Sequence, residues 1–249
     1  MIPSHLQLSM AGVILLLTII SGYIPFKKCA FTKYATDFPF GEALACGVFL
    51  GAGLIHMLGD ANSSFQDAGI DYPMAFLICG AMFLLLLLLE HVGSELKHHQ
   101  ESNNTIITLS VVMLAIHSLL EGTALGIGGD YAEIFILFFA IIAHKWAASF
   151  SLSLQINKSS LGLKSKIMLF SIFAIMTPIG ILFGLFIQLH TSNNYALAVF
   201  NSLAAGTFLY IGTLHGLSKA IMIKSCCNLK EFLLVIVGFS LMALVAIWT

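Results

Sequence analysis

The stretch AIHSLLEGTALGIG, residues 115 to 128, places two ionisable side chains, His117 and Glu121, inside an apolar run that is long enough to cross a membrane. An ionisable side chain at the centre of a bilayer costs about 2.5–3.5 kcal/mol on insertion scales. Something must offset that cost. A bound cation would do so, because its positive charge compensates the buried carboxylate.

The composition of the whole chain is that of an integral membrane protein. Of its 249 residues, 59% are hydrophobic and only 9% are charged, whereas a soluble domain carries about 25% charged residues. The net charge of −1 and the lack of arginine argue against a nucleic-acid partner, because no basic face exists to neutralise phosphates. The five cysteines show no CxxC spacing, which favours free thiols over a disulfide framework or a cysteine metal site.

Apolar runs of about 20 residues predict eight membrane-spanning helices. Their expected bounds are 6–26, 41–59, 73–91, 105–126, 132–155, 166–190, 195–217 and 230–248. The connections between them are short. Residues 1–249 are therefore predicted to form a single transmembrane domain, an all-α polytopic bundle in the lipid bilayer.

The lysines predict the orientation of this bundle. Ten of the eleven lie in the first, third, fifth and seventh loops, and the eleventh, Lys145, lies inside the fifth span. Because cytoplasmic loops carry the excess of basic residues, these four loops are predicted to be cytoplasmic and both termini to face outside. The plasma membrane is the expected location, with an intracellular organelle membrane as the alternative.

Three polar side chains are predicted to meet near the middle of the membrane. His117 and Glu121 are four residues apart and therefore share one helix face. His117 lies about 18 Å from the start of its span, and His144 lies equally far into the next span, which runs the opposite way. Two imidazoles and a carboxylate at one depth are the ligand set of a borderline divalent cation such as Zn²⁺. Ser118 could add a weak oxygen ligand or hold a water.

Other histidines and acids lie at other depths. His56 and Asp60 lie four residues apart toward the outer end of the second span, and His215 lies at the inner end of the seventh. His98 and His99 lie in the third loop, where they are either cytoplasmic metal contacts or only an exposed polar turn. Ligands outside, in the middle and inside indicate a route rather than a closed structural site.

Several motifs, in order along the chain, resemble those of the ZIP (Zrt/Irt-like) family of divalent metal transporters. HSLLEG at 117–122 resembles the signature of the family's fourth helix, and HKWAASFSLSL at 144–154 resembles that of its fifth. GVFLGAGLIHMLGDA at 47–61, TPIG at 177–180 and AAGTFLYIGTLHG at 204–216 resemble its second, sixth and seventh helices.

The resemblance implies a transporter, not an enzyme, that moves Zn²⁺ or a similar ion into the cytoplasm as its substrate, with no cofactor. It implies a metal site between the fourth and fifth helices. Carried over position by position, the primary ligands are His117, Glu121 and His144, the auxiliary ligand is Ser118, and the outer-entrance pair is His56 and Asp60. It also implies an elevator-like step, in which helices 1, 4, 5 and 6 move against a scaffold of helices 2, 3, 7 and 8.

The chain departs from the family at several of these positions. Relatives that hold two adjacent metals have acidic residues where this chain has Lys145, Ala148 and Gly180, so a single transport site is expected. Lys145 either pairs with Glu121 when no metal is present, or only extends to the membrane surface or caps a polar pocket. His215 stands where the family commonly has a carboxylate, and the third loop is shorter than the His-rich loops of many relatives.

An intramembrane zinc-dependent hydrolase is the alternative function, because Zn²⁺ with an open coordination position activates water. No His-Glu-x-x-His motif is present, and the central carboxylate is more simply a ligand. A metal-stabilised receptor would not explain ligands at three depths. Fe²⁺, Mn²⁺ and Cd²⁺ stay open beside Zn²⁺, because His/Glu sites accept them all. The sequence also leaves open whether the protein is a homodimer.

Overall fold

The computed structural model of the chain describes residues 4–31, 38–95, 103–190, 195–214 and 229–247. Within these ranges the regular secondary structure is helical throughout. Seven of the helices are long and apolar enough to cross a membrane. The prediction of an all-α, multi-pass membrane protein is therefore confirmed.

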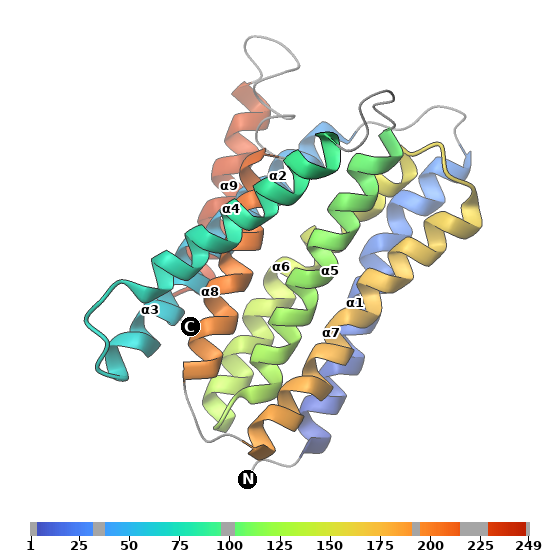
Figure 1. The fold of residues 1–249 in the computed structure, drawn as a ribbon. Coiled ribbons are helices and arrows are strands. Elements are labelled where there is room, and N and C mark those ends of the chain that lie inside the picture. Colours follow the sequence, from blue (N-terminus) through green and yellow to red (C-terminus); the bar gives the residue numbers. More distant parts are fainter. Residues whose placement is uncertain (1–3, 32–37, 96–102, 191–194, 215–228, 248–249) are drawn as a thin grey trace.

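The helices are joined mostly by short connections, and consecutive spans run in opposite directions (Figure 1). In chain order they are α1 (Ser4–Phe31), α2 (Pro39–Gly51), η1 (Ala52–Met57), α3 (Leu58–Asp67), α4 (Met74–Glu95), α5 (Asn103–Ile127), α6 (Tyr131–Asn157), α7 (Leu163–His190), α8 (Tyr195–Tyr210) and α9 (Leu229–Val245). The segments α2, η1 and α3 form one continuous helix, Pro39–Asp67, in which η1 is a π-helical turn.

The eighth predicted span corresponds to α9. Its 17 residues extend about 26 Å at 1.5 Å per residue, slightly less than the roughly 30 Å thickness of a bilayer's hydrocarbon core. The count of eight spans and the outside location of both termini therefore stay predictions. The second span continues to Asp67 rather than ending at residue 59, because its polar end is amphipathic and buries Ala61 and Phe65.

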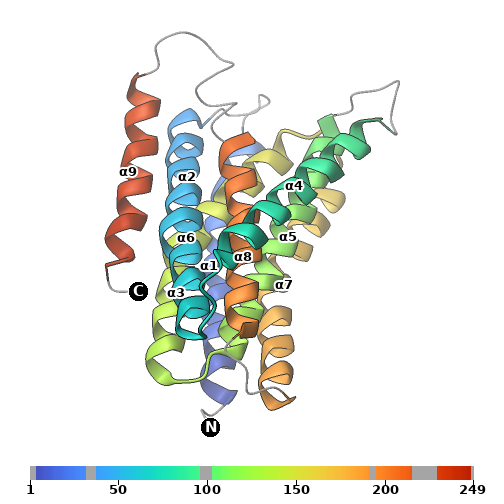
Figure 2. The same cartoon turned by 60° about the vertical axis from the view of Figure 1, so that its left-hand side comes forward.

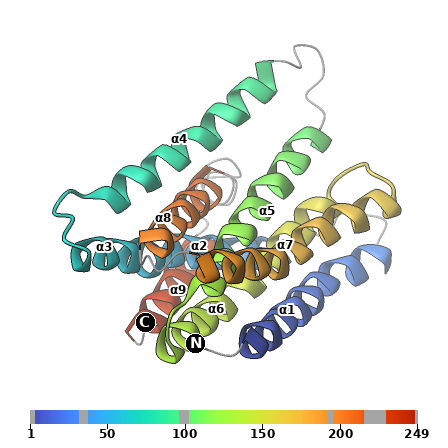
Figure 3. The same ribbon diagram turned by 60° about the horizontal axis from the view of Figure 1, so that its bottom comes forward.

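The helices can be divided into the two groups that the family resemblance predicts. In the first, which we call the transport group because the resemblance predicts that it moves, α5 packs against α7, and α1 packs against α6 and α7. In the second, the scaffold group, α2 packs against α9, and both α3 and α4 pack against α8. Figure 2 shows the scaffold helices α9, α2 and α8 in a row, with α4 slanting across α8. The groups meet where α5 contacts α8 and α6 contacts α2 (Figure 3).

Glycines allow backbone-to-backbone contact within each group. A Cβ atom at these positions would overlap backbone atoms of the partner helix, which is the packing expected of small residues four apart in membrane helices. They are Gly122 and Gly126 on α5, Gly180 and Gly184 on α7, Gly47 and Gly51 on α2, and Gly238 on α9.

Buried polar side chains also join helices of the transport group. The side-chain amide of Gln7 on α1 donates to the Leu125 carbonyl on α5 at 3.1 Å. The Ser149 hydroxyl on α6 donates to the Thr18 carbonyl on α1 at 2.5 Å. Because the membrane interior offers no water to replace such bonds, they favour a group that stays together.

Among the described residues, the lysines other than Lys145 gather at one end of the bundle. The end of α1, the α6–α7 connection and the start of α9 lie at one end (Figure 1), and they carry lysines. The end of α3 and the α5–α6 turn lie at the other end and carry acids. The lysines named for the first end are Lys27, Lys158, Lys164, Lys166 and Lys230, and the acids named for the other end are Asp67, Asp130 and Glu133. Acids such as Glu42 and Glu231 also lie at the lysine-rich end, so it is the lysines alone whose distribution agrees with the predicted orientation.

Candidate metal centre

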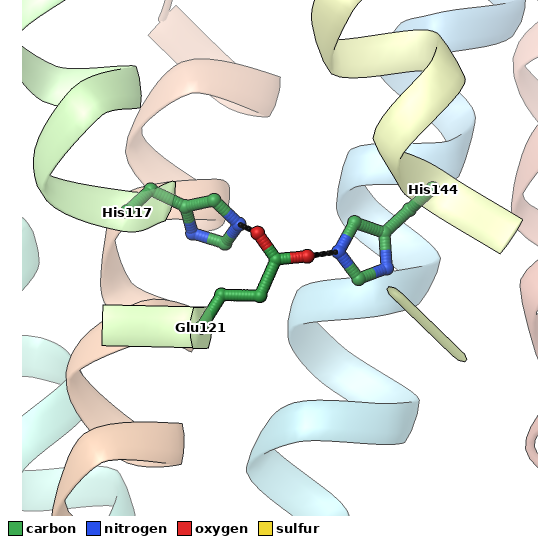
Figure 4. Close-up of side chains that lie close together, drawn as sticks. All are labelled: His117, Glu121 and His144. Atoms are coloured by element: carbon green, nitrogen blue, oxygen red, sulfur yellow. Dashed lines mark hydrogen bonds and ion pairs between the residues drawn. The ribbon is translucent and has the colours of Figure 1, made fainter. Parts of the chain in front are cut away.

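The structure brings together the three side chains that the sequence predicted to meet. His117 and Glu121 on α5 and His144 on α6 are all buried, and one ligand atom from each lies within 4.8 Å of the others (Figure 4). His144 Nε2 lies 2.9 Å from Glu121 Oε1, and His117 Nε2 lies 3.8 Å from Glu121 Oε2. Among the described residues, this is the single group of three such side chains.

A tight turn sets the register of α5 and α6. The Asp130 side chain precedes α6 and accepts the backbone N–H of Glu133 at 2.8 Å, while the Glu133 carboxylate accepts the N–H of Gly129 at 2.5 Å. Such capping satisfies backbone donors that the first turn of a helix leaves free. Because the turn is short and the helices are antiparallel, His144 returns to the depth of His117.

Lys145 extends its ammonium into the same cluster. Its Nζ atom lies 3.0 Å from Glu121 Oε2, 2.8 Å from Ser118 Oγ and 2.6 Å from Thr177 Oγ1. These three acceptors match the three N–H donors of an ammonium group. The ammonium also lies 5.0 Å from the centre of the Phe173 ring. Of the two interpretations left open by the sequence, the structure therefore shows the pair with Glu121.

Two consecutive residues of α8 approach the cluster from the scaffold group. Thr207 Oγ1 lies 2.7 Å from Nδ1 of His117. The Phe208 ring stacks on the His117 ring with centroids 3.6 Å apart, and it meets the His144 ring edge-on at 4.9 Å. Sequence reasoning missed Thr177, Thr207 and Phe208, although all three lie in motifs that carried the family resemblance.

The predicted outer pair lies apart from this cluster. His56 Nδ1 lies 2.8 Å from Asp60 Oδ2, with His56 buried in η1 and Asp60 part-exposed at the start of α3. The two atoms are in contact, but the geometry is not that of a hydrogen bond. The remaining predicted contacts, His98, His99 and His215, lie outside the described residues.

The sequence profile of a transporter family matches nearly the whole chain. The profile is described as ZIP Zinc transporter and matches residues 4–108 and 100–246. The chain belongs to the ZIP zinc transporter family. Family membership confirms the resemblance and, because the family consists of transporters, confirms that the protein is not an enzyme. The hydrolase alternative is therefore set aside.

Individual ZIP proteins match over most of their length. Zinc transporter 11 of Arabidopsis thaliana is 30% identical over 95% of this chain and 83% of its own. Zinc transporter ZIP2 of Mus musculus is 27% identical over 82% of this chain and 83% of its own. Zinc transporter ZIP1 of Danio rerio is 27% identical over 92% of this chain and 93% of its own. This ZIP chain therefore matches most of the length of each of these three relatives.

Proposed function

We propose that this protein transports Zn²⁺ into the cytoplasm through the site formed by His117, Glu121 and His144, between α5 and α6. The observation that carries the proposal is the cluster itself, in which three buried atoms of the types that Zn²⁺ binds lie within 4.8 Å of one another. The names of the relatives support zinc as the substrate, since each is a zinc transporter.

The spacing of the ligand atoms fits a zinc ion after small side-chain movements. Nitrogen and oxygen ligands of tetrahedral Zn²⁺ lie about 2.0–2.1 Å from the metal, which separates two of them by about 3.3 Å. The separations of 2.9 Å and 3.8 Å between the imidazoles and Glu121 lie on either side of this value. Three protein ligands leave a fourth position open, which suits an ion that must enter and leave.

The same site would accept related ions. Fe²⁺, Mn²⁺ and Cd²⁺ also bind imidazole and carboxylate ligands, so the ligand set favours a transition-metal transporter without singling out one ion. The inward direction is proposed from the family resemblance, and the lysine-rich end is expected to be the cytoplasmic end at which the ion is released. We expect the plasma membrane as the location.

For the transport step we propose that the transport group slides against the scaffold group. All the site residues belong to the transport group. His117 and Glu121 lie on α5, and His144 and Lys145 lie on α6.

Backbone contacts at glycines hold each group together internally, and buried hydrogen bonds add to this within the transport group. The boundary is crossed by side-chain pairs such as Lys158 with Glu42 and His117 with Thr207. Side-chain pairs can exchange partners without breaking a helix crossing.

Uptake of radiolabelled Zn²⁺ by liposomes that contain the purified full chain tests the proposal. Wild-type protein should load the vesicles with Zn²⁺, and Glu121→Ala should reduce loading to that of protein-free liposomes. Competition by Fe²⁺, Mn²⁺ and Cd²⁺ then ranks the ions. If wild-type vesicles load no faster than protein-free ones, the transport proposal is wrong. If Glu121→Ala transports normally, the site assignment is wrong.

A further inference from the structure

Buried hydrogen bonds link the imidazole of His117 to helix α8. The Thr207 hydroxyl donates to the Ala204 carbonyl at 2.6 Å. Nδ1 of His117 lies 2.7 Å from Thr207 Oγ1 and 3.2 Å from the Ala204 carbonyl oxygen. All three residues are buried. The three polar atoms, His117 Nδ1, Thr207 Oγ1 and the Ala204 carbonyl oxygen, therefore satisfy one another's hydrogen bonding.

The network determines which ring nitrogen carries the proton. A carbonyl oxygen can only accept, and the single O–H of Thr207 is used on the Ala204 carbonyl. Nδ1 of His117 must therefore be the donor, and it directs its N–H toward Thr207 Oγ1 and the Ala204 oxygen. A neutral imidazole protonated at Nδ1 has its free lone pair on Nε2.

That free lone pair points into the candidate metal centre. Nε2 of His117 is buried without a hydrogen-bond partner, and it lies 3.8 Å from Glu121 Oε2. The lone pair of His117 Nε2 and the carboxylate oxygen of Glu121 are both electron-rich. The space between these two atoms therefore favours a cation. His117 is thus set to bind metal before any metal arrives.

The other imidazole is arranged differently. Nε2 of His144 lies 2.9 Å from Glu121 Oε1, and a carboxylate already paired with Lys145 accepts rather than donates. His144 Nε2 therefore carries a proton here, and its Nδ1 is the nitrogen without a partner. To bind metal through Nε2, His144 must release this proton, whereas His117 needs no such change.

We propose that Thr207 is a positioning residue that presets His117 for metal binding, an inference that rests on the proposed transport function. Thr207 belongs to the scaffold group and His117 to the transport group. Phe208, which stacks on the His117 ring, also fixes its orientation. The ring is consequently held in the Nδ1–H form only while α5 and α8 keep this register. Metal affinity at His117 is high in this register and falls once the transport group moves past α8.

Substitutions that separate the hydroxyl from the shape of the side chain test this role. Thr207→Val keeps the branched shape and removes the hydroxyl, leaving only the longer contact to the Ala204 carbonyl. Loss of such an outer partner costs about 10- to 100-fold in metal affinity, so the KM for Zn²⁺ uptake into liposomes should rise by about tenfold. Thr207→Ser restores the hydroxyl and should return KM to the wild-type value.

The control lies just beyond the end of α8, in the same apolar span, Tyr195–Leu214. The Thr213 hydroxyl donates to the Leu209 carbonyl of its own turn at 2.6 Å, so Thr213→Val removes a hydroxyl without touching His117 and should leave KM unchanged. A readout independent of transport is nitrogen NMR of histidine-labelled, metal-free protein. The His117 signals, assigned with His117→Asn, should be those of the Nδ1–H form in the wild type.

The outcomes separate this inference from the proposed function. If wild-type protein takes up Zn²⁺ but Thr207→Val has the wild-type KM, the positioning role is wrong while transport stands. Equal impairment of the Val and Ser variants would also overturn the role, because it would show that packing matters rather than the hydroxyl. So would a wild-type His117 protonated at Nε2. A wild type that takes up no Zn²⁺ contradicts the proposed function instead.

Discussion

The Nζ atom of Lys145 lies 3.0 Å from Oε2 of Glu121, and both side chains are buried. The carboxylate that the sequence placed inside the membrane is thus compensated by an ammonium even before a metal binds. Removing one partner of a buried ion pair leaves an uncompensated charge, which is strongly destabilising. The pair therefore compensates the charge of Glu121 within the protein itself, and it limits how many cations the site can hold.

The first prediction is that the central site holds one Zn²⁺ per chain. An ammonium and a dication 4 Å apart repel each other by about 8 kcal/mol at an effective dielectric constant near 20, so Lys145 excludes a second ion beside the first. Lys145→Asp should admit a second ion or bind the first more tightly. Metal content of purified protein, with His98 and His99 replaced to remove loop binding, measures this. Two central ions with Lys145 intact would contradict it.

A second prediction concerns the three ligands. His117→Ala, Glu121→Ala and His144→Ala should each reduce Zn²⁺ uptake to background while the protein still reaches the membrane, because each removes one of three ligand atoms. His5→Ala, an exposed histidine on α1, is the control and should transport normally. Near-normal uptake in two of the three ligand variants would mean that Zn²⁺ passes elsewhere.

The position of the candidate metal centre was predictable because helix geometry is regular. Residues four apart share a face, which placed Glu121 beside His117. A rise of 1.5 Å per residue, counted from the start of each of the two antiparallel spans, brought His144 to the same depth. The close contact of these three side chains in the structure follows from that arithmetic.

The surroundings of the centre were not predictable in the same way. The apolar residues of α7 and α8 leave open which face of each helix turns inward, so hydropathy did not show that Thr177 and Thr207 would reach the site. Lys145 was ambiguous because a long, flexible side chain can either extend to the membrane surface or fold inward. Only the packing of α5, α6 and α7 around its ammonium decides between them.

The third prediction is that the site rejects Ca²⁺ and Mg²⁺. Two imidazoles and one carboxylate are a poor shell for these ions, which prefer oxygen ligands throughout. A large excess of either ion should leave Zn²⁺ uptake into liposomes unchanged, whereas Cd²⁺ should compete. Effective competition by Mg²⁺ would show that the histidines do not coordinate the transported ion.

A fourth prediction concerns the crossing of α5 and α7. A side chain at Gly122 would overlap the Thr177 carbonyl, whereas Gly80 on α4 has open space around it. Gly122→Val should therefore push the helices apart and lower the free energy of unfolding by about 1–3 kcal/mol, the cost typical of overpacking. The melting temperature of the purified protein should fall accordingly. Gly80→Val is the matched control. Equal melting temperatures for the two variants would contradict the backbone contact.

The last prediction concerns an ion pair across the boundary between the two helix groups. Lys158 lies just after α6, and its Nζ atom is 2.5 Å from Glu42 Oε1 in the first turn of α2. The two side chains are 29% and 28% exposed. Beside it, the rings of Phe38 and Phe150 meet edge-to-face with centroids 5.8 Å apart. These contacts join the two groups at the lysine-rich end, so the proposed sliding of the transport group would have to break the pair.

Weakening this pair should speed transport without changing the metal site. A part-exposed ion pair contributes about 0.2–1 kcal/mol, which corresponds to roughly a 1.5- to 5-fold change in the equilibrium for opening this end. Lys158→Gln should raise the maximal rate of Zn²⁺ uptake by a factor in that range and leave KM unchanged. High salt should shrink the difference, because it screens exposed charges.

Exchanging the two charges separates the ion pair from other effects of the substitution. Glu42→Lys combined with Lys158→Glu rebuilds the pair in reverse and should return the rate toward the wild-type value, while Lys158→Glu alone should raise it. Lys166→Gln is the control, because the Lys166 ammonium donates to the Asn157 carbonyl within the transport group at 2.9 Å. If the double variant behaves like Lys158→Glu alone, the pair does not restrain the sliding of the two groups.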